Sequence, residues 1–194
     1  MGKKRLVLIA YLISILFFIV SFFIDKKVSY YTAFIRNSVL DYSLSSITQF
    51  GSVFIILVFM TTLFLWKERK REWIPVLWTS LFVSTMTCII LKSIIARPRP
   101  LDIFAVSSLI LYSFPSLHAT AAFTVIPVLD KEFPKFKWFW VIFALLVAFS
   151  RIYFQYHYLS DVIGGALIGY SFGWLFVHLE ERDKIFKKWK IGLS

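Results

Sequence analysis

Charged residues are scarce in this chain. Only 17% of its 194 residues are Asp, Glu, Lys or Arg, whereas 59% are hydrophobic and the mean hydropathy is +0.74. In an average soluble domain about a quarter of the residues carry charge. A soluble globule could not bury so much apolar surface, so the composition excludes an ordinary soluble domain and indicates an integral membrane protein.

Acidic residues are half as numerous as basic ones, and there is one cysteine. Asp and Glu total 11 against 22 Lys and Arg, which gives a net charge of +11, and the single cysteine, Cys88, lies inside an apolar run. One cysteine excludes a disulfide framework and a thiolate metal site. The basic residues stand between apolar runs, and no basic-aromatic binding module is visible, so no nucleic-acid partner is expected. Their charge instead indicates loops beside anionic membrane lipid.

Continuous apolar runs of roughly 17 to 25 residues, divided by charged or proline-rich breaks, predict membrane-spanning helices. The predicted fold class is all-α: a polytopic transmembrane helical bundle with six spans in a single domain, residues 1–194. The spans fall near Leu6–Ile24, Phe50–Trp66, Trp73–Ile95, Ser116–Leu129, Trp138–Tyr156 and Leu159–Leu179.

The distribution of Lys and Arg predicts the orientation of these spans. If the N-terminus is cytoplasmic, the cytoplasmic segments carry most of the basic residues outside the spans, including Arg5, Lys70, Lys137 and Lys188. Both termini are then cytoplasmic. The predicted location is a cell (inner) membrane, with the outer ends of the spans facing the periplasm or the cell exterior.

The segment between the first two predicted spans has apolar residues at helical spacing from Tyr31 to Tyr42. This spacing fits a helix that lies in the plane of the membrane interface. It fits an ordinary packed loop helix equally well, so both interpretations stay open.

Ionisable residues inside apolar runs are costly in lipid, so they are expected to be paired or functional. Lys92 lies near the end of the third span, and Arg97-Pro98-Arg99-Pro100 follows it. The prolines end the helix, which places both arginines in an outer loop with Lys92 just below them. Alone, this group would also fit a snorkelling lysine with interfacial arginines.

A second polar group covers residues 113–118, where Pro115 and Ser116 precede an apolar run and suit the start of a helix. Backbone N–H groups at such a start, together with a serine hydroxyl, can hold phosphate oxygens. His118 then lies in the first turn and points toward a bound anion. Taken alone, a serine cap and an interfacial histidine are more often structural than functional.

The third group lies between the fifth and sixth spans. His157 and Asp161 are four residues apart, so in a helix they would share a face, and the carboxylate could bond one imidazole nitrogen. Arg151 ends the fifth span on the same side of the membrane, where its guanidinium can grip two phosphate oxygens. With six spans, all three groups fall at the outer ends of spans three to six, so their cations and histidines can converge.

These residues resemble a known family. Lys92 to Pro100 fits the motif Lys-x6-Arg-Pro, residues 115–118 resemble Pro-Ser-Gly-His, and Ser150 to Asp161 fits Ser-Arg-x5-His-x3-Asp. The chain is thereby similar to the type 2 phosphatidic acid phosphatase superfamily, which includes vanadium haloperoxidases and glucose-6-phosphatase. The resemblance covers residues from about Lys92 to Asp161 and the six-helix plan.

The resemblance implies roles for the site residues. The nucleophile that attacks phosphorus would be His157, oriented by Asp161, and His118 would protonate the leaving oxygen before water hydrolyses the phosphohistidine. The phosphoryl group would be bound by Lys92, Arg99, Ser116, Leu117 and Arg151. Fixed cations can neutralise the phosphoryl oxygens without a metal, so neither a metal nor another cofactor is expected. Because His157 has to be neutral and His118 protonated, we expect a bell-shaped pH profile.

Two residues stand apart from the family pattern. Leu117 replaces the usual glycine, whose missing side chain allows the backbone to approach an anion closely. Leucine keeps the N–H but narrows the pocket, which leaves the substrate and the final acceptor open. Arg97 is not in the motif, and both a contact with the substrate headgroup and a surface anchor fit it.

The function predicted is an integral membrane lipid phosphatase that acts on the extracytoplasmic face. Its partners would be membrane lipid and a lipid phosphate substrate: undecaprenyl pyrophosphate, phosphatidylglycerol phosphate, phosphatidic acid or the 1-phosphate of lipid A. The alternative is a lipid phosphotransferase that uses the same phosphohistidine. A transporter that keeps the motifs without turnover fits intact His118, His157 and Asp161 poorly. The oligomeric state stays open.

Overall fold

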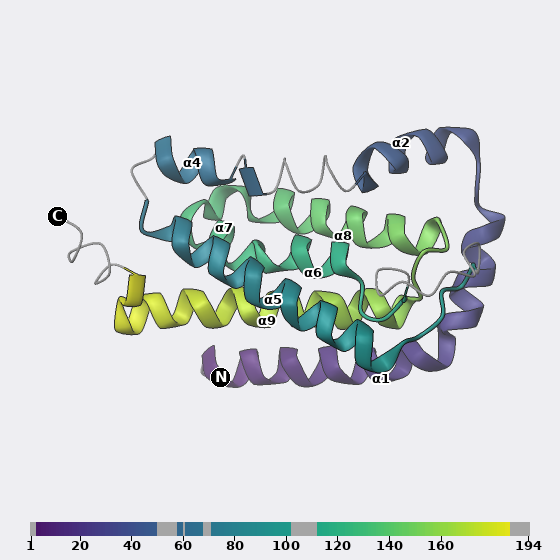
Figure 1. The fold of residues 1–194 in the computed structure, drawn as a ribbon, viewed down its shortest axis with the longest axis horizontal. Helices are drawn as coiled ribbons and strands as arrows, with labels where there is room; N and C mark the ends of the chain where they lie inside the picture. The colour runs from purple at the N-terminus through teal and green to yellow at the C-terminus, as the bar shows by residue number, and fades with distance from the viewer. Residues whose placement is uncertain (1–2, 50–57, 60, 68–70, 102–111, 187–194) are drawn as a thin grey trace.

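The fold is given by a computed structural model, which describes residues 3–49, 58–59, 61–67, 71–101 and 112–186 (Figure 1). Within these ranges the regular secondary structure is entirely helical, as the predicted all-α class requires. In chain order the elements are α1 (Lys3–Phe34), α2 (Ser38–Thr48), α4 (Thr61–Lys67), α5 (Trp73–Ile95), α6 (Leu117–Thr124), α7 (Ile126–Glu132), the short 3-10 helix η3 (Pro134–Phe136), α8 (Lys137–Tyr153) and α9 (Leu159–Asp183).

The long helices α1, α5, α8 and α9 run along the long axis of the molecule, with α6 between them (Figure 1). Helix α9 packs against α6, α5 and α1, while α8 packs against α6 and α2. The C-terminal ends of α5 and α8 and the N-terminal ends of α6 and α9 therefore come together at one end of the bundle. The start of α1 and the end of α9 lie toward the opposite end.

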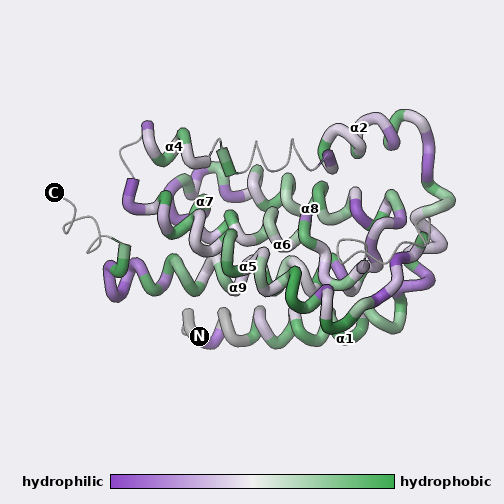
Figure 2. The backbone as a smooth tube through the Cα atoms, viewed as in Figure 1, coloured by the Kyte–Doolittle hydropathy of each residue, from purple (hydrophilic) through white to green (hydrophobic). Residues whose placement is uncertain are grey.

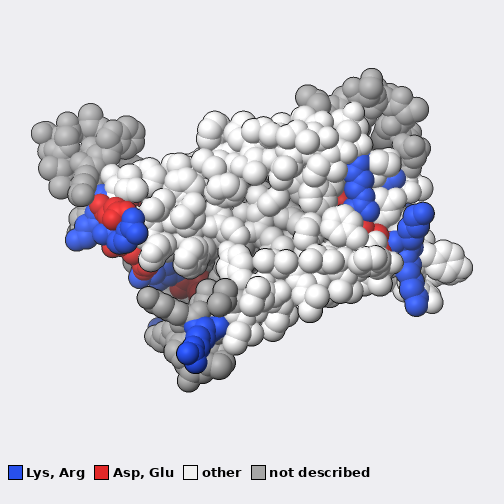
Figure 3. All heavy atoms as spheres, turned by 90° about the horizontal axis from the view of Figure 1, so that it is seen from below, with Lys and Arg blue, Asp and Glu red and all other residues white. Residues whose placement is uncertain are grey.

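The surface of the bundle suits a membrane. Among the described residues, three helical segments are long and apolar enough to cross one, at Trp73–Ile95, Pro134–Tyr153 and Leu159–Asp183. Large apolar side chains face outward along them: Phe82 is 65% exposed, and Ile94 and Trp138 are each 72% exposed. Hydrophobic residues follow the length of these helices (Figure 2), and on the face seen in Figure 3 Lys and Arg gather toward the two ends. Such an apolar surface would be an aggregation liability in water and is expected in lipid.

The predicted spans agree with the helices where an apolar run is unbroken. The third matches α5, the fifth and sixth lie largely in α8 and α9, and Leu6–Ile24 lies inside α1, which continues to Phe34. The fourth, Ser116–Leu129, is not one helix: α6 ends at Thr124 and α7 begins at Ile126. Pro127 lacks a backbone N–H and clashes with the preceding turn, which explains the break. Most of Phe50–Trp66 lies outside the described residues, so six spans stay a prediction.

The segment predicted as one helix from Tyr31 to Tyr42 is divided between two. Helix α1 ends at Phe34, and α2 begins at Ser38 after its N-cap, Asn37. The Asn37 side chain accepts a hydrogen bond from the backbone N–H of Leu40, at 2.9 Å. Because a capping asparagine satisfies N–H groups at a helix start, it favours a new helix here over continuation of α1.

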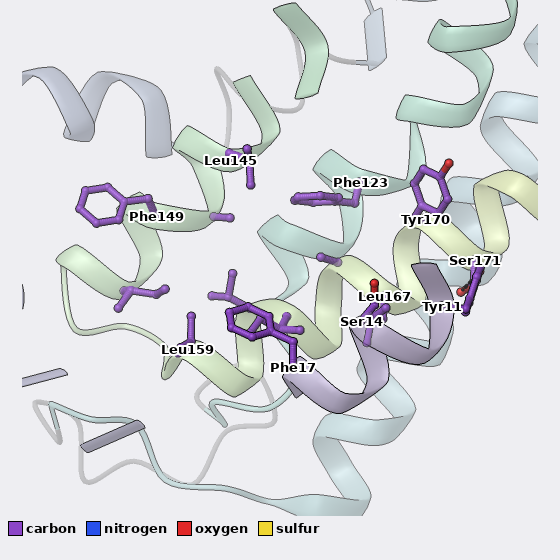
Figure 4. A pocket seen from close by; sticks show the side chains of 15 residues that line it. Tyr11, Ser14, Phe17, Phe123, Leu145, Phe149, Leu159, Leu167, Tyr170 and Ser171 are labelled. Carbon is purple, nitrogen blue, oxygen red and sulfur yellow. Dashed lines mark hydrogen bonds between the residues drawn. The ribbon is translucent and has the colours of Figure 1, made fainter. Parts of the chain in front are cut away.

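An apolar cavity of about 530 Å³ lies between α1, α6, α8 and α9 (Figure 4). Its lining includes Phe17, Phe123, Leu145 and Leu159. At its far end the Tyr11 hydroxyl hydrogen-bonds the Ser171 hydroxyl at 2.8 Å. The cavity offers apolar contacts along nearly its whole length, which suits a hydrocarbon chain.

Candidate active site

The three polar groups predicted from the sequence meet at one end of the bundle. His118, in the first turn of α6, lies within electrostatic range of Arg151, His157, Arg99 and Lys92. These residues come from the end of α5, the loop after it, the end of α8 and the loop before α9. The structure thus brings the histidines together with the cations of all three groups, although their catalytic roles stay predictions.

His157 and Asp161 are both deeply buried, at 2% and 0% exposure. The condition for a shared helix face is not met, because α9 begins at Leu159 and His157 precedes it, as the predicted start of the sixth span implied. Asp161 is the third residue of α9, where its carboxylate caps the helix by accepting from the Tyr158 N–H at 2.7 Å. The Nδ1 atom of His157 lies 3.8 Å from this carboxylate, within electrostatic range but beyond a hydrogen bond.

The Asp161 carboxylate is held in place by several donors. Besides the Tyr158 N–H, it accepts a short hydrogen bond from the Ser113 hydroxyl and one from Nη1 of Arg97 at 2.7 Å. The backbone N–H of Ser116 donates to the carbonyl oxygen of Asp161 at 2.9 Å. These bonds tie the start of α9 to the segment that begins α6, so the carboxylate has a fixed position beside His157.

The cationic side chains provide donors for an anion. Lys92 is buried, and its Nζ donates to the carbonyl oxygens of Tyr112 at 2.6 Å and Ser113 at 3.3 Å. Nη1 of Arg151 donates to the Thr48 hydroxyl at 2.5 Å. The Nε of Arg151 and the buried hydroxyl of Ser116 have no hydrogen-bond partner among the described residues. Because buried donors are normally satisfied, both atoms are suited to oxygens of a bound phosphate.

A cleft of about 360 Å³ opens beside these donors and is lined by residues of α2, α6 and α8 and of the following loop. The lining includes His118, Arg151, Thr48 and Tyr156. The Arg151 guanidinium lies 4.5 Å from the centre of the Tyr156 ring, and the Arg99 guanidinium lies 6.0 Å from it. A phosphate that enters this cleft would meet His118 and Arg151.

Leu117 is the first residue of α6, directly after the N-cap Ser116. Its side chain is half-buried, and the backbone at this position begins a regular helix. A leucine is therefore accommodated where the family pattern has glycine, and its N–H lies at the helix N-terminus, where backbone donors favour an anion.

Arg97 has charged partners inside the protein, which neither of its two predicted roles includes. Nη2 donates to Asp25 of α1 at 2.8 Å, and Nη1 donates to Asp161 and to the Ser160 hydroxyl. Burial alone would lower the pKa of Arg97, but the hydrogen bond and charge of Asp25, with the charge of Asp161, raise it above its ordinary value. Arg97 is thus an internal cation that bridges α1 and α9.

Several residues of this end of the molecule were missed by the sequence reasoning. Asp25, Ser113 and Ser160 complete the surroundings of Asp161, and Thr48 supports Arg151. Gln155 links the loop before α9 to α1 by donating to the carbonyl oxygen of Ser29 at 2.9 Å. Asp25 carries the one signal that could have been read, a carboxylate directly after a long apolar run.

Burial controls the protonation of His157. Desolvation, opposed by Asp161 and reinforced by Lys92 and Arg151, lowers the pKa of the imidazole to about 4. Burial disfavours the charged form of a histidine, so His157 is neutral over the physiological range and has a lone pair available for attack. This agrees with the neutral state that a nucleophilic histidine requires.

A pH prediction follows from this shift. If the reaction needs neutral His157, kcat/KM should stay high as the pH falls through 6 and should decline only as the pH approaches about 4. Initial rates of phosphate release between pH 3.5 and 8, normalised to the fraction of folded protein at each pH, would measure this acidic limb. A limb at pH 6.5 or above would contradict a desolvated His157 nucleophile.

Fold and site together define a helical membrane protein with a buried histidine-carboxylate pair beside a cleft lined by His118 and Arg151. Residues 73–185 match the family model of the PAP2 superfamily. The chain belongs to this superfamily, which confirms the resemblance read from the motifs. The match covers α5 to α9, and therefore every predicted site residue.

Individual relatives agree with this membership. The chain is 28% identical over 150 residues to the undecaprenyl-diphosphatase BcrC of Bacillus subtilis, an alignment that covers 75% of this chain and 78% of the relative. A crystal structure of a transmembrane PAP2-type phosphatidylglycerolphosphate phosphatase from Bacillus subtilis superimposes with a TM-score of 0.72 at 26% identity, over 88% of this chain and 96% of the other. The crystal structure of Aquifex aeolicus LpxE gives 0.68 at 29% identity, over 80% and 95%.

Proposed function

We propose that the chain is an integral membrane phosphatase that hydrolyses a phosphomonoester or pyrophosphate of a lipid through a phosphohistidine intermediate. The observation that carries the proposal is the position of the buried His157, 3.8 Å from Asp161 and within electrostatic range of His118, Arg151 and Lys92. Two of the similar proteins are named as an undecaprenyl-diphosphatase and a phosphatidylglycerolphosphate phosphatase. Membership of the superfamily supports the same class of reaction.

The chemistry uses two in-line displacements. The imidazole nitrogen of His157 that faces away from Asp161 attacks phosphorus, the bond from phosphorus to the leaving oxygen breaks, and His118 gives that oxygen its proton. Water then attacks the phosphohistidine, His118 takes a proton from it, and the phosphorus–nitrogen bond breaks to release phosphate. Lys92, Arg99, Arg151, Ser116 and the N–H of Leu117 would stabilise the charge on the phosphoryl oxygens throughout.

The substrate tail and the membrane orientation are parts of the same proposal. The apolar cavity between α1 and α9 has the lining that a lipid chain needs (Figure 4). We propose a single domain with six spans and both termini in the cytoplasm of a cell (inner) membrane. The start of α1 and the end of α9 lie toward the same end of the bundle, which fits this arrangement. The active site at the other end would then face the periplasm or the cell exterior.

A panel assay tests the proposed function. Purified protein in detergent should release inorganic phosphate from at least one of undecaprenyl pyrophosphate, phosphatidylglycerol phosphate, phosphatidic acid and lipid A 1-phosphate. Because the proposed cradle consists of protein cations, the rate should be unchanged by EDTA. Absence of release from the whole panel would overturn the proposal, and loss of activity with EDTA would overturn metal independence. A phosphorylated acceptor formed without free phosphate would identify a phosphotransferase instead.

A further inference from the structure

A buried ion-pair network connects α1 to the active site. The carboxylate of Asp25, 2% exposed, accepts from Nη2 of Arg97 at 2.8 Å, from the Ser160 N–H at 2.9 Å and from the Ser160 hydroxyl at 2.5 Å. Nη1 of Arg97 donates to Asp161 at 2.7 Å and to the Ser160 hydroxyl at 2.6 Å. One guanidinium is thus shared between the carboxylate of α1 and the carboxylate that faces His157.

The surroundings of Arg97 fix its position. Its guanidinium lies 4.2 Å from the centre of the Tyr158 ring and 5.5 Å from that of Phe22, so aromatic faces cover it from two sides. Buried charged groups that are paired and hydrogen-bonded on all sides are costly to rearrange. Arg97 is therefore held between the carboxylates of Asp25 and Asp161.

We propose that Arg97 and Asp25 are a positioning pair that sets how strongly Asp161 attracts the imidazole of His157, so that α1 is a working part of the active site. Both residues act through Asp161 and touch neither the phosphate nor the leaving group. Asp25 lies outside residues 73–185, which carry the family match, and the pair lies outside the three motifs. The inference rests on the proposed role of His157 as nucleophile.

Because Arg97 and Asp25 carry opposite charges, removing one or the other should shift the pKa of His157 in opposite directions. Replacing Asp25 by asparagine leaves Arg97 with Asp161 as its one carboxylate partner in the network, so the negative charge beside His157 is more fully neutralised. Protonated His157 is then less stable, and its pKa falls. Replacing Arg97 by glutamine leaves the Asp161 charge uncompensated, so protonated His157 is more stable, and its pKa rises. In the double variant the two effects oppose each other, and the pKa returns toward that of the wild type.

Other charged or titratable groups also face His157 or Asp161, and they stay unchanged in these variants. They are Lys92 of α5, Arg99 after α5, His118 of α6, Arg151 of α8 and Tyr158 before α9. Differences between variants therefore report the Arg97–Asp25 pair and not these common neighbours.

The test follows His157 directly. The chain has three histidines, His118, His157 and His178. Full-length protein labelled with 13C at histidine Cε1 gives three signals, which single His→Gln variants assign. Titration of the His157 signal in wild type, Asp25→Asn, Arg97→Gln and the double variant should show a downward shift, an upward shift and a return, each single shift being roughly half a pH unit or more. Lys137→Gln is the matched control, because it removes the 2.7 Å ion pair with Asp130 at the other end of α8 and should not move His157.

The outcomes separate positioning from a merely structural role. Opposite shifts support the proposal, whereas unchanged titration, or shifts of both single variants in one direction, would overturn it. If Arg97→Gln does not fold, Asp25→Asn decides alone: a downward shift supports the pair, and no shift refutes it. In steady-state kinetics, kcat of the Arg97→Gln and Asp25→Asn variants should fall about tenfold or more with little change in KM. The substitutions disturb the placement of Asp161 beside His157 and leave substrate binding intact. A raised KM at constant kcat would instead make Arg97 a substrate contact.

This readout does not depend on turnover. If the wild type releases no phosphate from any lipid of the panel, the proposed function fails, but the titration still measures the coupling of Arg97 and Asp25 to His157. If the wild type is active and the His157 signal shifts in neither variant, the function stands and the positioning pair fails.

Discussion

Replacing His157 by glutamine is expected to reduce phosphate release by about a thousandfold or more, while the protein stays folded. Glutamine keeps a polar side chain of similar length but has no nitrogen lone pair that can attack phosphorus. The loss should appear in kcat, because the proposed phosphate-binding residues Arg151, Lys92 and Ser116 are unchanged. The measurement is single-turnover and steady-state phosphate release from the best lipid of the panel, with the elution profile of the variant in detergent as the folding control.

His178 provides a matched control for this substitution. It lies far along α9 from the site, stacked at 5.3 Å on the ring of Trp174. His178→Gln removes the same functional group and should keep phosphate release within about twofold of the wild-type rate, as expected for a surface substitution. A His157→Gln protein that still released phosphate at the wild-type rate would refute the phosphohistidine mechanism, whatever the result for His178.

The sequence predicted the long helices well where one physical signal dominates. The runs that form α5, α8 and α9 are uninterrupted and bounded by prolines or charges, so the length needed to cross a bilayer decides their limits. The run 116–129 was predicted as one span by the same criterion, and this prediction is wrong. Its composition is apolar throughout, but Pro127 ends the regular hydrogen bonding and divides it into α6 and α7.

In the site, features set by position along the chain could be predicted, whereas contacts made by helix packing could not. The convergence of the three motifs could be predicted, because they lie at the same ends of consecutive spans. The relation of His157 to Asp161 was predicted only in part: the sixth span was expected to start at Leu159, as α9 does, but the cap that Asp161 forms on the Tyr158 N–H was not foreseen. The partners of Arg97 were also out of reach, since Asp25 is 72 residues away in the chain and meets it only through the packing of α1 on α9.

The contact between α6 and α9 holds the site together and depends on residues that carry no chemistry. Gly165, Gly169 and Gly173 are spaced four apart on α9 and face α6. A Cβ atom on them would lie 2.5 Å from the carbonyl oxygen of Ser116, 2.1 Å from that of Thr120 and 2.2 Å from that of Thr124, respectively. Small residues at this spacing let two helices approach backbone to backbone in a membrane. Because α6 begins with Ser116 and carries His118, this close approach positions both residues.

Gly169→Leu is therefore expected to cause the largest loss of folded protein among single changes outside the polar site. The new side chain would meet backbone atoms, which cannot rotate away, so α9 would have to separate from α6. A cost of about 3 kcal/mol or more, at the upper end for overpacked cores, corresponds to a fall in apparent melting temperature of roughly 6 to 12 °C. Thermal unfolding in detergent measures this fall, and any folded remainder should have low activity because Ser116 and His118 are displaced.

The control for this substitution lies one turn earlier on the same helix. Ala166 faces the apolar cavity of about 530 Å³, so Ala166→Val adds volume where there is room for it. Its melting temperature should stay within about 2 °C of the wild-type value, as expected for a change of well under 1 kcal/mol. Equal melting temperatures for Gly169→Leu and Ala166→Val would mean that α6 and α9 do not meet at the glycines. The placement of Ser116 and His118 by that contact would then be wrong as well.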